Sequence, residues 1–454
     1  MIMKAVAGVI ALLSVTVFAL PEVSAAFDTE TVDPTSGVFM FFCGMLVFIM
    51  APAIALFYGG MLRKQSMTSM MAQCLGVMGL VMVIWWVVGY SLAAGGDGQF
   101  IGNFDYIFGK DLSTTEGTGS ITEGGGIPTM EYFLFQGCFA IVTACIVFGA
   151  TAERIRYPAV LAFLTLWSFL VYAPMAHMVW FGGFLSDGIT ELGFPAQDFA
   201  GGTVVHMCSA ISGVACAVAI GKRSSRISKG RSHNVPMMFL GAMILWVGWF
   251  GFNCGSEGKF DEIAILAMVN TMIASAVSTV AWIVIQYLHV GRVNVTGLCA
   301  GVLSGLVGIT PGCGFVEPWA AVIIGVVAAV VVYFGIIFMR EKSGIDDALD
   351  VMGVHGIGGI WGCIAVGIFA VAEYGWVPEP NPIGGLIEGN YEMLVGQLVN
   401  VVVTLVYCFV VSFVIMKVID FVMLRLTGRG ARLSEEEQMI GSDIIEHGEP
   451  SYVM

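Results

Sequence analysis

The sequence predicts an all-α polytopic membrane protein with eleven transmembrane helices, in which an inverted five-plus-five repeat is followed by one extra long helix. Three observations predict this class. The 454 residues are 57% hydrophobic and only 11% charged, whereas soluble domains carry about 25% charged residues. Eleven apolar segments reach the roughly 20 residues that a helix needs to cross a bilayer. The fifth and the tenth segments each contain a histidine and follow closely after an aspartate.

The eleven segments follow one another with loops between them. They are residues 37–58, 67–94, 129–150, 158–180, 200–221, 236–255, 262–289, 294–310, 318–339, 351–371 and 392–424. Many contain Gly, Ala, Ser or Thr at close spacing, and small residues let membrane helices approach one another. The last segment is longer than a crossing requires, so we expect it to lie across the outside of the bundle.

Both ends of the chain differ from the apolar body. Residues 1–26 combine Lys4, an apolar run and the small residues at 24–26, a pattern typical of a cleaved secretory signal peptide. The alternative is a twelfth, uncleaved helix. Residues 27–426 are predicted to form the transmembrane domain. Residues 427–454 are polar and are expected to form an exposed cytoplasmic tail, either a flexible end or a regulatory contact.

The distribution of Lys and Arg predicts the topology. Of the nineteen basic residues, sixteen fall in alternate loops and in the tail, whereas the opposite loops hold Lys110 and Lys259, and Lys4 lies in the signal. Positive loops stay cytoplasmic. We therefore expect the mature N-terminus outside and the C-terminus inside. Acidic residues lean toward the outer loops, where they either enrich cations or form ordinary solvated surface.

Several classes of site are not predicted. The net charge of −14 does not suggest nucleic-acid binding. The eleven cysteines are scattered without a CxxC pair, so we expect neither a disulfide framework nor a metal site. Whether Cys254 and Cys313, near outer helix ends, pair with each other stays open. Nucleotide-binding motifs are incomplete, and we expect no cofactor and no enzymatic activity.

Two histidines are the first candidate site residues. Asp198 precedes His206 in the fifth segment, and Asp350 precedes His355 in the tenth. A protonatable side chain at membrane depth is costly and is a functional-site hypothesis by default. The alternatives are a packing hydrogen bond or haem ligation. Because each half holds an odd number of helices, the halves run in opposite directions, and such transporters place their sites near the midplane.

Aromatic residues gather at the predicted outer helix ends. Phe135 and Phe139 lie four residues apart, Trp180 ends the fourth segment, and Phe252 lies four residues before Ser256. Aromatic faces attract a cation by about 0.5–2 kcal/mol, although an interfacial aromatic belt is the alternative. No row of charged residues crosses the helices, which argues against passage of a hydrated ion and permits a small neutral molecule.

Several motifs together resemble one known family. They are Gly149-Ala-Thr-Ala-Glu153-Arg154, His177-Met-Val-Trp180, Asp198-Phe-Ala-Gly-Gly-Thr-Val-Val-His206, Trp249-Phe-Gly-Phe252-Asn and Gly353-Val-His355-Gly. In this order they are similar to the signatures of the ammonium transporter family, the Amt/Mep/Rh superfamily, and most similar to its bacterial Amt branch. The resemblance covers the chain from about residue 36 to the tail.

The resemblance implies a homotrimer of eleven-helix subunits, each with its own pore for ammonium or its analogue methylammonium. It implies that Trp180, Phe135, Phe139 and Ser256 recruit ammonium at an outer site, supported by Asp198. Phe139 and Phe252 correspond to a stacked phenyl gate, and His206 and His355 to twin pore histidines. Ammonium would lose its proton before a hydrophobic pore; whether transport is electrogenic stays open.

The resemblance also implies where the protein works and what it meets there. It implies a bacterial inner-membrane protein surrounded by lipid. Its cytoplasmic face and tail are expected to contact a PII-type regulatory protein. A tail that signals ammonium to a partner is the remaining alternative, although residues 427–454 contain no recognisable output domain.

Overall fold

The computed structural model describes residues 28, 30–117, 126–227, 232–375 and 383–452. Within this part of the chain the regular structure is helical, and the only β-structure is two isolated bridges. Eleven of the described helices are long and apolar enough to cross a membrane, as predicted. The expected signal peptide, residues 1–26, lies outside the described residues.

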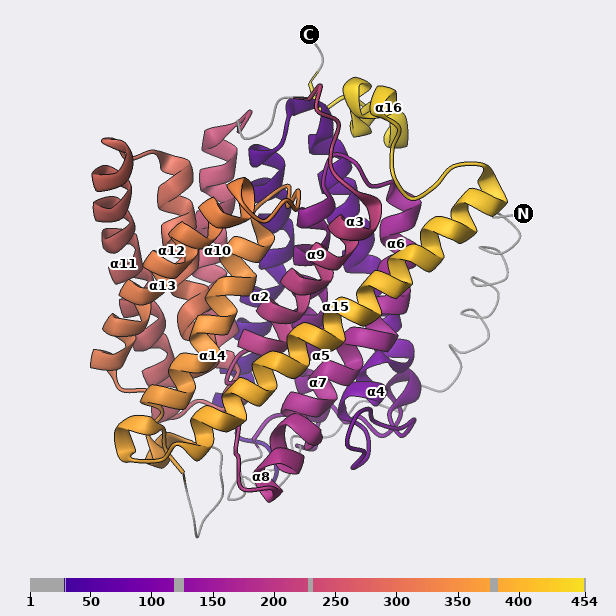
Figure 1. The fold of residues 1–454 in the computed structure, drawn as a ribbon. Helices are drawn as coiled ribbons and strands as arrows, with labels where there is room; N and C mark the ends of the chain where they lie inside the picture. Colours follow the sequence, from indigo (N-terminus) through magenta and orange to yellow (C-terminus); the bar gives the residue numbers. More distant parts are fainter. Residues whose placement is uncertain (1–27, 29, 118–125, 228–231, 376–382, 453–454) are drawn as a thin grey trace.

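Each half of the repeat supplies five spans (Figure 1). The first half consists of α2 (Pro34–Met61), α3 (Met67–Ile84) with α4 (Tyr90–Ala94), α5 (Thr129–Val147), α6 (Tyr157–Trp167) with α7 (Ala173–Trp180), and α9 (Cys208–Ile220). The second half consists of α10 (Val235–Gly255), α11 (Glu262–Val290), α12 (Val295–Ile309), α13 (Pro318–Glu341) and α14 (Ile357–Phe369). The short α8 (Ile189–Glu191) follows α7. These boundaries agree with the predicted segments to within a few residues.

Several spans begin at a side-chain cap that the sequence itself encodes. The Asp33 carboxylate accepts hydrogen bonds from the backbone N–H groups of Thr35 and Ser36 at the start of α2. Asn234 does the same for Met237 in α10. Both caps are followed by a proline within the first turn, where its missing N–H costs nothing. A cap followed by proline therefore fixes where each apolar run becomes a helix.

The first helices of the two halves, α2 and α10, pack against each other through glycines. A Cβ atom at Gly241 would lie 2.4 Å from the backbone nitrogen of Phe57, and one at Gly251 would lie 2.8 Å from the carbonyl oxygen of Cys43. Real side chains do not tolerate such distances. The absence of side chains lets the two backbones touch, which is how membrane helices associate where water supplies no hydrophobic drive.

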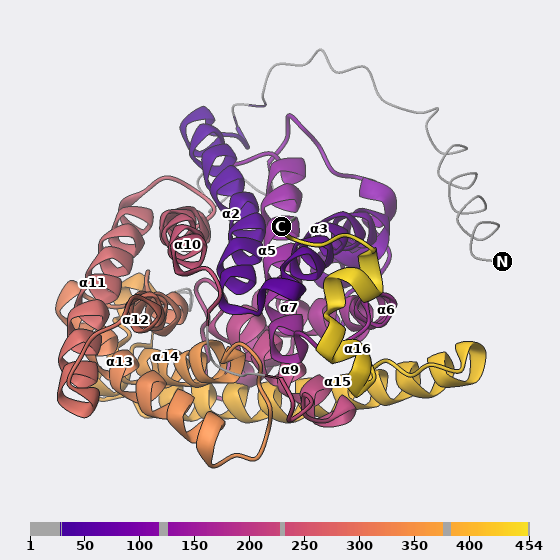
Figure 2. The same ribbon diagram turned by 90° about the horizontal axis from the view of Figure 1, so that it is seen from above.

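The eleventh span, α15 (Glu392–Thr427), runs diagonally across one face of the bundle (Figure 1). It packs on α9, α14 and α6, and seen from above its C-terminal end projects beyond α6 (Figure 2). Only a third of its most apolar window is buried, against 94% for the span containing α5. The prediction of a peripheral long helix is confirmed, and α5 and α9 form the centre.

Four of the spans contain a widened, π-helical turn. These turns are Trp85–Gly89, Ser168–Tyr172, Gly202–Met207 and Met352–Gly356. The apolar pattern of the sequence predicts a continuous helix for each span. It does not reveal a turn that contains one more residue than an α-helical turn. Such turns are frequent at functional sites. The last two contain His206 and His355.

The tail, predicted to be exposed and either flexible or a regulatory contact, has many exposed residues but is partly buried against the bundle. Its helix α16 (Glu435–Ile440) begins with a capping box between Ser434 and Glu437. Further along, Asp443 is 1% exposed and its Oδ1 accepts a hydrogen bond from the Ser69 backbone N–H, at 2.8 Å. Arg156 pairs with Glu437 at 2.5 Å. The described tail is therefore docked on the bundle, because its acidic side chains find basic and N–H partners there.

Candidate functional site

The two predicted histidines meet at the centre of the protein. The Nδ1 atoms of His206 and His355 are 3.2 Å apart, and the ring centroids are 5.3 Å apart with an interplanar angle of 27°. Both side chains are buried, at 1% and 8% exposure. At this distance one ring donates to the other, since a neutral imidazole carries one N–H and one acceptor nitrogen. The inverted repeat thus brings together residues that are 149 positions apart.

Asp198 holds the turn that carries His206. Its Oδ1 accepts hydrogen bonds from the backbone N–H groups of Gly201 and Gly202, at 2.9 and 2.7 Å. Its Oδ2 accepts from the N–H groups of Thr203 and Val204, at 2.8 and 3.3 Å, and from the Thr203 hydroxyl. These are the N–H groups that a helix start leaves unpaired. The carboxylate therefore stabilises the start of this helix. It does not line the cavity next to Trp180 that is described below.

The counterpart of Asp198 in the second half is Asp347, where the sequence had suggested Asp350. Asp347 precedes His355 by eight residues, the same spacing as Asp198 and His206. Its Oδ2 accepts a hydrogen bond from the Met352 backbone N–H, five residues later, at 2.7 Å. Asp350 instead binds Arg340 through both of its oxygens. Both aspartates can be read from the sequence. Only the geometry shows that Asp347 caps the helix and that Asp350 forms an ion pair.

A narrow apolar cavity adjoins the histidines. Its volume is about 20 Å³, close to the space that a single water molecule needs. The Nε2 atom of His206, whose side chain lines this cavity, forms no hydrogen bond with any described residue. The lining residues are Met50, Ile54, Phe57, Tyr58, Val142, Ile146, His206, Leu245, Trp249, Phe252, Leu303 and His355. The cavity therefore has room for one small molecule and offers it imidazole nitrogens and the Tyr58 hydroxyl, which also has no partner among the described residues, as polar partners.

Two phenyl rings lie between this cavity and a second one. We call the second one the outer cavity, because it lies on the side where the sequence predicts the outer loops. Phe139 and Phe252 stack with centroids 4.1 Å apart and an interplanar angle of 15°. Both are almost completely buried. Phe139 also lines the outer cavity and Phe252 the inner one. The two residues that the sequence analysis assigned to a gate are therefore stacked between the two cavities.

The outer cavity has a volume of about 50 Å³ and is lined by Tyr132, Gln136, Phe139, Trp180, Phe199 and Ser256. Trp180 lies edge-on to Phe139, with centroids 5.8 Å apart. Its indole N–H donates to the Asp198 carbonyl oxygen at 2.8 Å. Thus Asp198 reaches the cavity only through its backbone, which orients Trp180.

The residues that line the outer cavity differ in part from those predicted for the outer site. Phe135 does not line the cavity but packs behind Phe139, at 4.9 Å between centroids. Tyr132 and Gln136 line the cavity and were missed. Their positions, seven and three residues before Phe139, place all three on one helical face. That spacing was the signal available in the sequence.

A larger cavity, about 550 Å³, opens on the other side of His355. It is partly polar: Gln286, His289, Asn294, Arg340 and Asp350 are among its lining residues. The sequence analysis did not identify this cavity, because its walls come from six separate spans. His355 lines both this cavity and the apolar one, and the stacked rings of Phe139 and Phe252 lie between the apolar cavity and the outer one.

A buried charge cluster lies at the helix ends beside this large cavity, where the sequence predicts the cytoplasmic side. Glu153 pairs with Arg63 and Arg223, each at 2.8 Å, and Arg223 also pairs with Asp346 at 2.8 Å. Burial would raise the pKa of the Asp346 carboxyl, but the hydrogen bonds from Arg223 hold that pKa well below its usual range. The next residue along the chain is Asp347, which caps the turn carrying His355.

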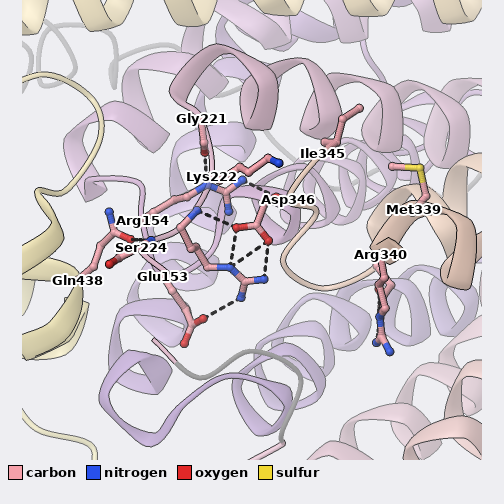
Figure 3. Close-up of polar contacts among 12 residues, drawn as sticks. Glu153, Arg154, Gly221, Lys222, Ser224, Met339, Arg340, Ile345, Asp346 and Gln438 are labelled. Atoms are coloured by element: carbon pink, nitrogen blue, oxygen red, sulfur yellow. Dashed lines mark hydrogen bonds and ion pairs between the residues drawn. The ribbon is translucent and has the colours of Figure 1, made fainter. Parts of the chain in front are cut away.

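The tail contacts this charge cluster. The side chain of Gln438 accepts a hydrogen bond from the Ser224 backbone N–H at 2.8 Å. Arg154, which is fully buried, donates to the carbonyl oxygens of Gly221 and Asp346. Figure 3 shows these residues gathered at one point, with Gln438 next to Ser224. The motif ending in Glu153-Arg154 is therefore a junction between both halves and the tail.

The comparisons with known proteins agree with this arrangement. Residues 38–452 match the model of the Ammonium Transporter Family. An ammonium transporter of Bacillus subtilis is 40% identical over 418 residues, which cover 91% of this chain and 98% of that protein. An ammonium transporter of Aquifex aeolicus is 39% identical and covers 90% of each chain.

The solved structures give the same result. The crystal structure of Candida albicans Mep2 superposes with a TM-score of 0.80 and 32% sequence identity, covering 90% of this chain and 88% of that chain. A structure described as a Sensor Amt Protein superposes with a TM-score of 0.78 and 26% identity, covering 90% and 97%. The relatives are transporters and not enzymes. With eleven spans, two opposed halves and matching motifs along nearly its whole length, this chain belongs to the ammonium transporter family.

Proposed function

We propose that this ammonium transporter recruits ammonium at the outer aromatic cavity, removes its proton there, and conducts ammonia past His206 and His355. One observation carries the proposal: two imidazoles in mutual contact, 3.2 Å apart, line a cavity whose other walls are mostly apolar. Because the cavities on both sides are at least partly polar, the apolar cavity between them is where ammonia is selected over ions.

Recruitment rests on aromatic faces and on one hydroxyl. Trp180 and Phe139 present faces or edges to the outer cavity, and cation–π attraction contributes about 0.5–2 kcal/mol. The Ser256 hydroxyl donates to the Phe252 carbonyl oxygen at 2.9 Å, so its lone pairs remain to accept an N–H from ammonium. A hydrated alkali ion has no N–H to give. Phe135 holds Phe139 from behind, and Asp198 orients Trp180.

Deprotonation is favoured over entry of the intact ion by the sizes of the two costs. Releasing the ammonium proton near neutral pH costs about 3 kcal/mol, for roughly two pKa units at 1.36 kcal/mol each. Burying an unpaired ion in an apolar interior costs tens of kcal/mol by Born estimates. Ammonia then passes once the stacked rings of Phe139 and Phe252 separate, and the unpaired Nε2 of His206 provides its first polar partner inside.

The cellular setting follows from the sequence and from family membership. We place the protein in a bacterial inner membrane, with the N-terminus outside after signal cleavage and the C-terminus in the cytoplasm, because the positive loops and the docked tail lie on one side. We further propose a homotrimer with one pore per subunit. A PII-type regulatory protein is the proposed partner at the cytoplasmic face.

The proposal is tested by ammonium-evoked currents from purified protein in proteoliposomes on a solid-supported membrane, together with methylammonium uptake. We expect the His206→Ala variant to lose uptake, or to change its selectivity, while still folding. A matched control is His233→Ala, because His233 lies outside the pathway. Unchanged uptake, current and selectivity in His206→Ala would contradict the histidine route. Uptake without current would mean that ammonia alone crosses and that the proton stays outside.

A further inference from the structure

The imidazole of His206 is held mainly by stacking. Among the described residues its only side-chain hydrogen bond is the one from Nδ1 to His355. Its ring lies nearly parallel to the indole of Trp249, with centroids 5.3 Å apart and an interplanar angle of 21°. The orientation of the His206 ring therefore depends on the orientation of Trp249.

The indole of Trp249 is in turn anchored by a buried polar chain. Its N–H donates to the Thr310 hydroxyl oxygen at 2.8 Å. The Thr310 hydroxyl lies 2.7 Å from the Leu306 carbonyl oxygen and 3.3 Å from Oδ1 of Asn253, and donates to one or the other. The amide nitrogen of Asn253 donates to the hydroxyl oxygen of Thr271 at 2.9 Å. The three polar members Asn253, Thr271 and Thr310 are fully buried, and they come from α10, α11 and the turn that follows α12.

This anchor selects one orientation of the indole ring. The torsion that rotates an aromatic ring about its bond to Cβ has a broad energy profile, so packing alone specifies it weakly. At membrane depth no water replaces a lost partner, and an unpaired buried N–H is unfavourable. The bond to Thr310 therefore keeps the indole plane parallel to the imidazole. Rotation of the indole would remove the flat surface on which His206 rests.

We propose that Thr310 is a positioning residue for the pore: through Trp249 it fixes the ring plane of His206, without touching the transported molecule itself. This role of Thr310 rests on the proposed function only because it concerns the same pore, the one lined by His206 and His355. The proposal assigns a role to a threonine outside the motifs quoted from the sequence. Thr310 lies 104 positions from His206 in the sequence.

The test compares Thr310→Val, which removes the acceptor of the indole N–H, with Thr310→Ser, which keeps it. The first readout is the nitrogen resonances of the His206 ring, measured by solid-state NMR on histidine-labelled protein in lipid bilayers. The second is the ammonium-evoked current. We expect Thr310→Val to split or broaden the His206 signals and to lower the current about three- to tenfold, the range that one hydrogen bond of ordinary strength supplies. Thr310→Ser should restore both.

A matched control is Thr404→Val, because Thr404 is equally buried but its hydroxyl bonds, within the described part of the chain, to Asn400 of its own helix. Should Thr310→Val fail to fold, Trp249→Phe removes the N–H and leaves no unpaired donor, and it should change the His206 signals in the same way. Wild-type signals and current in Thr310→Val, or in Trp249→Phe if that variant must serve, would overturn the proposal. A wild-type protein without ammonium current would instead refute the proposed function, and the NMR comparison would still decide the role of Thr310.

Discussion

Replacing Asp198 by Asn should strongly destabilise the protein, because this carboxylate accepts hydrogen bonds from four backbone N–H groups and one hydroxyl. An amide has a single oxygen. If that oxygen keeps the bonds from Thr203 and Val204, the N–H groups of Gly201 and Gly202 face an NH₂ group. Each unsatisfied buried donor costs about 1–3 kcal/mol, so we expect a loss of about 2–6 kcal/mol.

Thermal unfolding of the purified protein in detergent measures this loss, with methylammonium uptake in parallel. The repeat supplies a matched control, since Asp347→Asn keeps an acceptor for the single bond from Met352 and removes a buried charge. That variant should unfold at the wild-type temperature or above it. If Asp198→Asn is as stable as Asp347→Asn, the carboxylate does not hold the turn of His206 and the reasoning from its hydrogen bonds is wrong.

Two further predictions concern packing and protonation. Gly241→Ala should destabilise the protein by about 1–3 kcal/mol, because the new methyl group would meet the Phe57 backbone of α2. Gly79→Ala is the control and should not destabilise it, because nothing lies within 4 Å of a Cβ atom there. The measurement is the unfolding temperature of each variant, and equal temperatures would contradict direct contact between the two backbones. Burial, and next the charge of Asp350, raise the pKa of Asp347 to about 6. Since the unfolded value is about 3.9, the folded state disfavours the charged form. Stability should therefore fall as pH rises from about 4 to about 6 and stay level above that, and infrared difference spectra that show this carboxyl already ionised at pH 5 would refute the shift.

Most of the fold was predictable from the sequence, whereas the site was predictable only in part. Apolar runs of about 20 residues and their flanking charges determine the helices, since a helix of that length crosses the bilayer with its backbone hydrogen bonds satisfied within the segment. His206 and His355 were recognisable because an imidazole is exceptional at that depth. The polar lining of the large cavity was not, because residues such as Gln286 of α11 and Arg340 of α13 line one cavity only when the spans assemble. The same holds for Asp347, whose role depends on which N–H lies within reach.

The long peripheral helix restricts how the two halves can move. With 36 residues, α15 measures about 54 Å, much longer than the ≈ 30 Å hydrocarbon core of a bilayer. It joins the first half through the hydrogen bond between Ser412 and Ser212, at 2.9 Å, and it packs against α14 of the second half. A rocking movement of one half against the other would displace both contacts of α15. The scaffold therefore favours conduction through a stationary tunnel, in which the moving parts are single side chains.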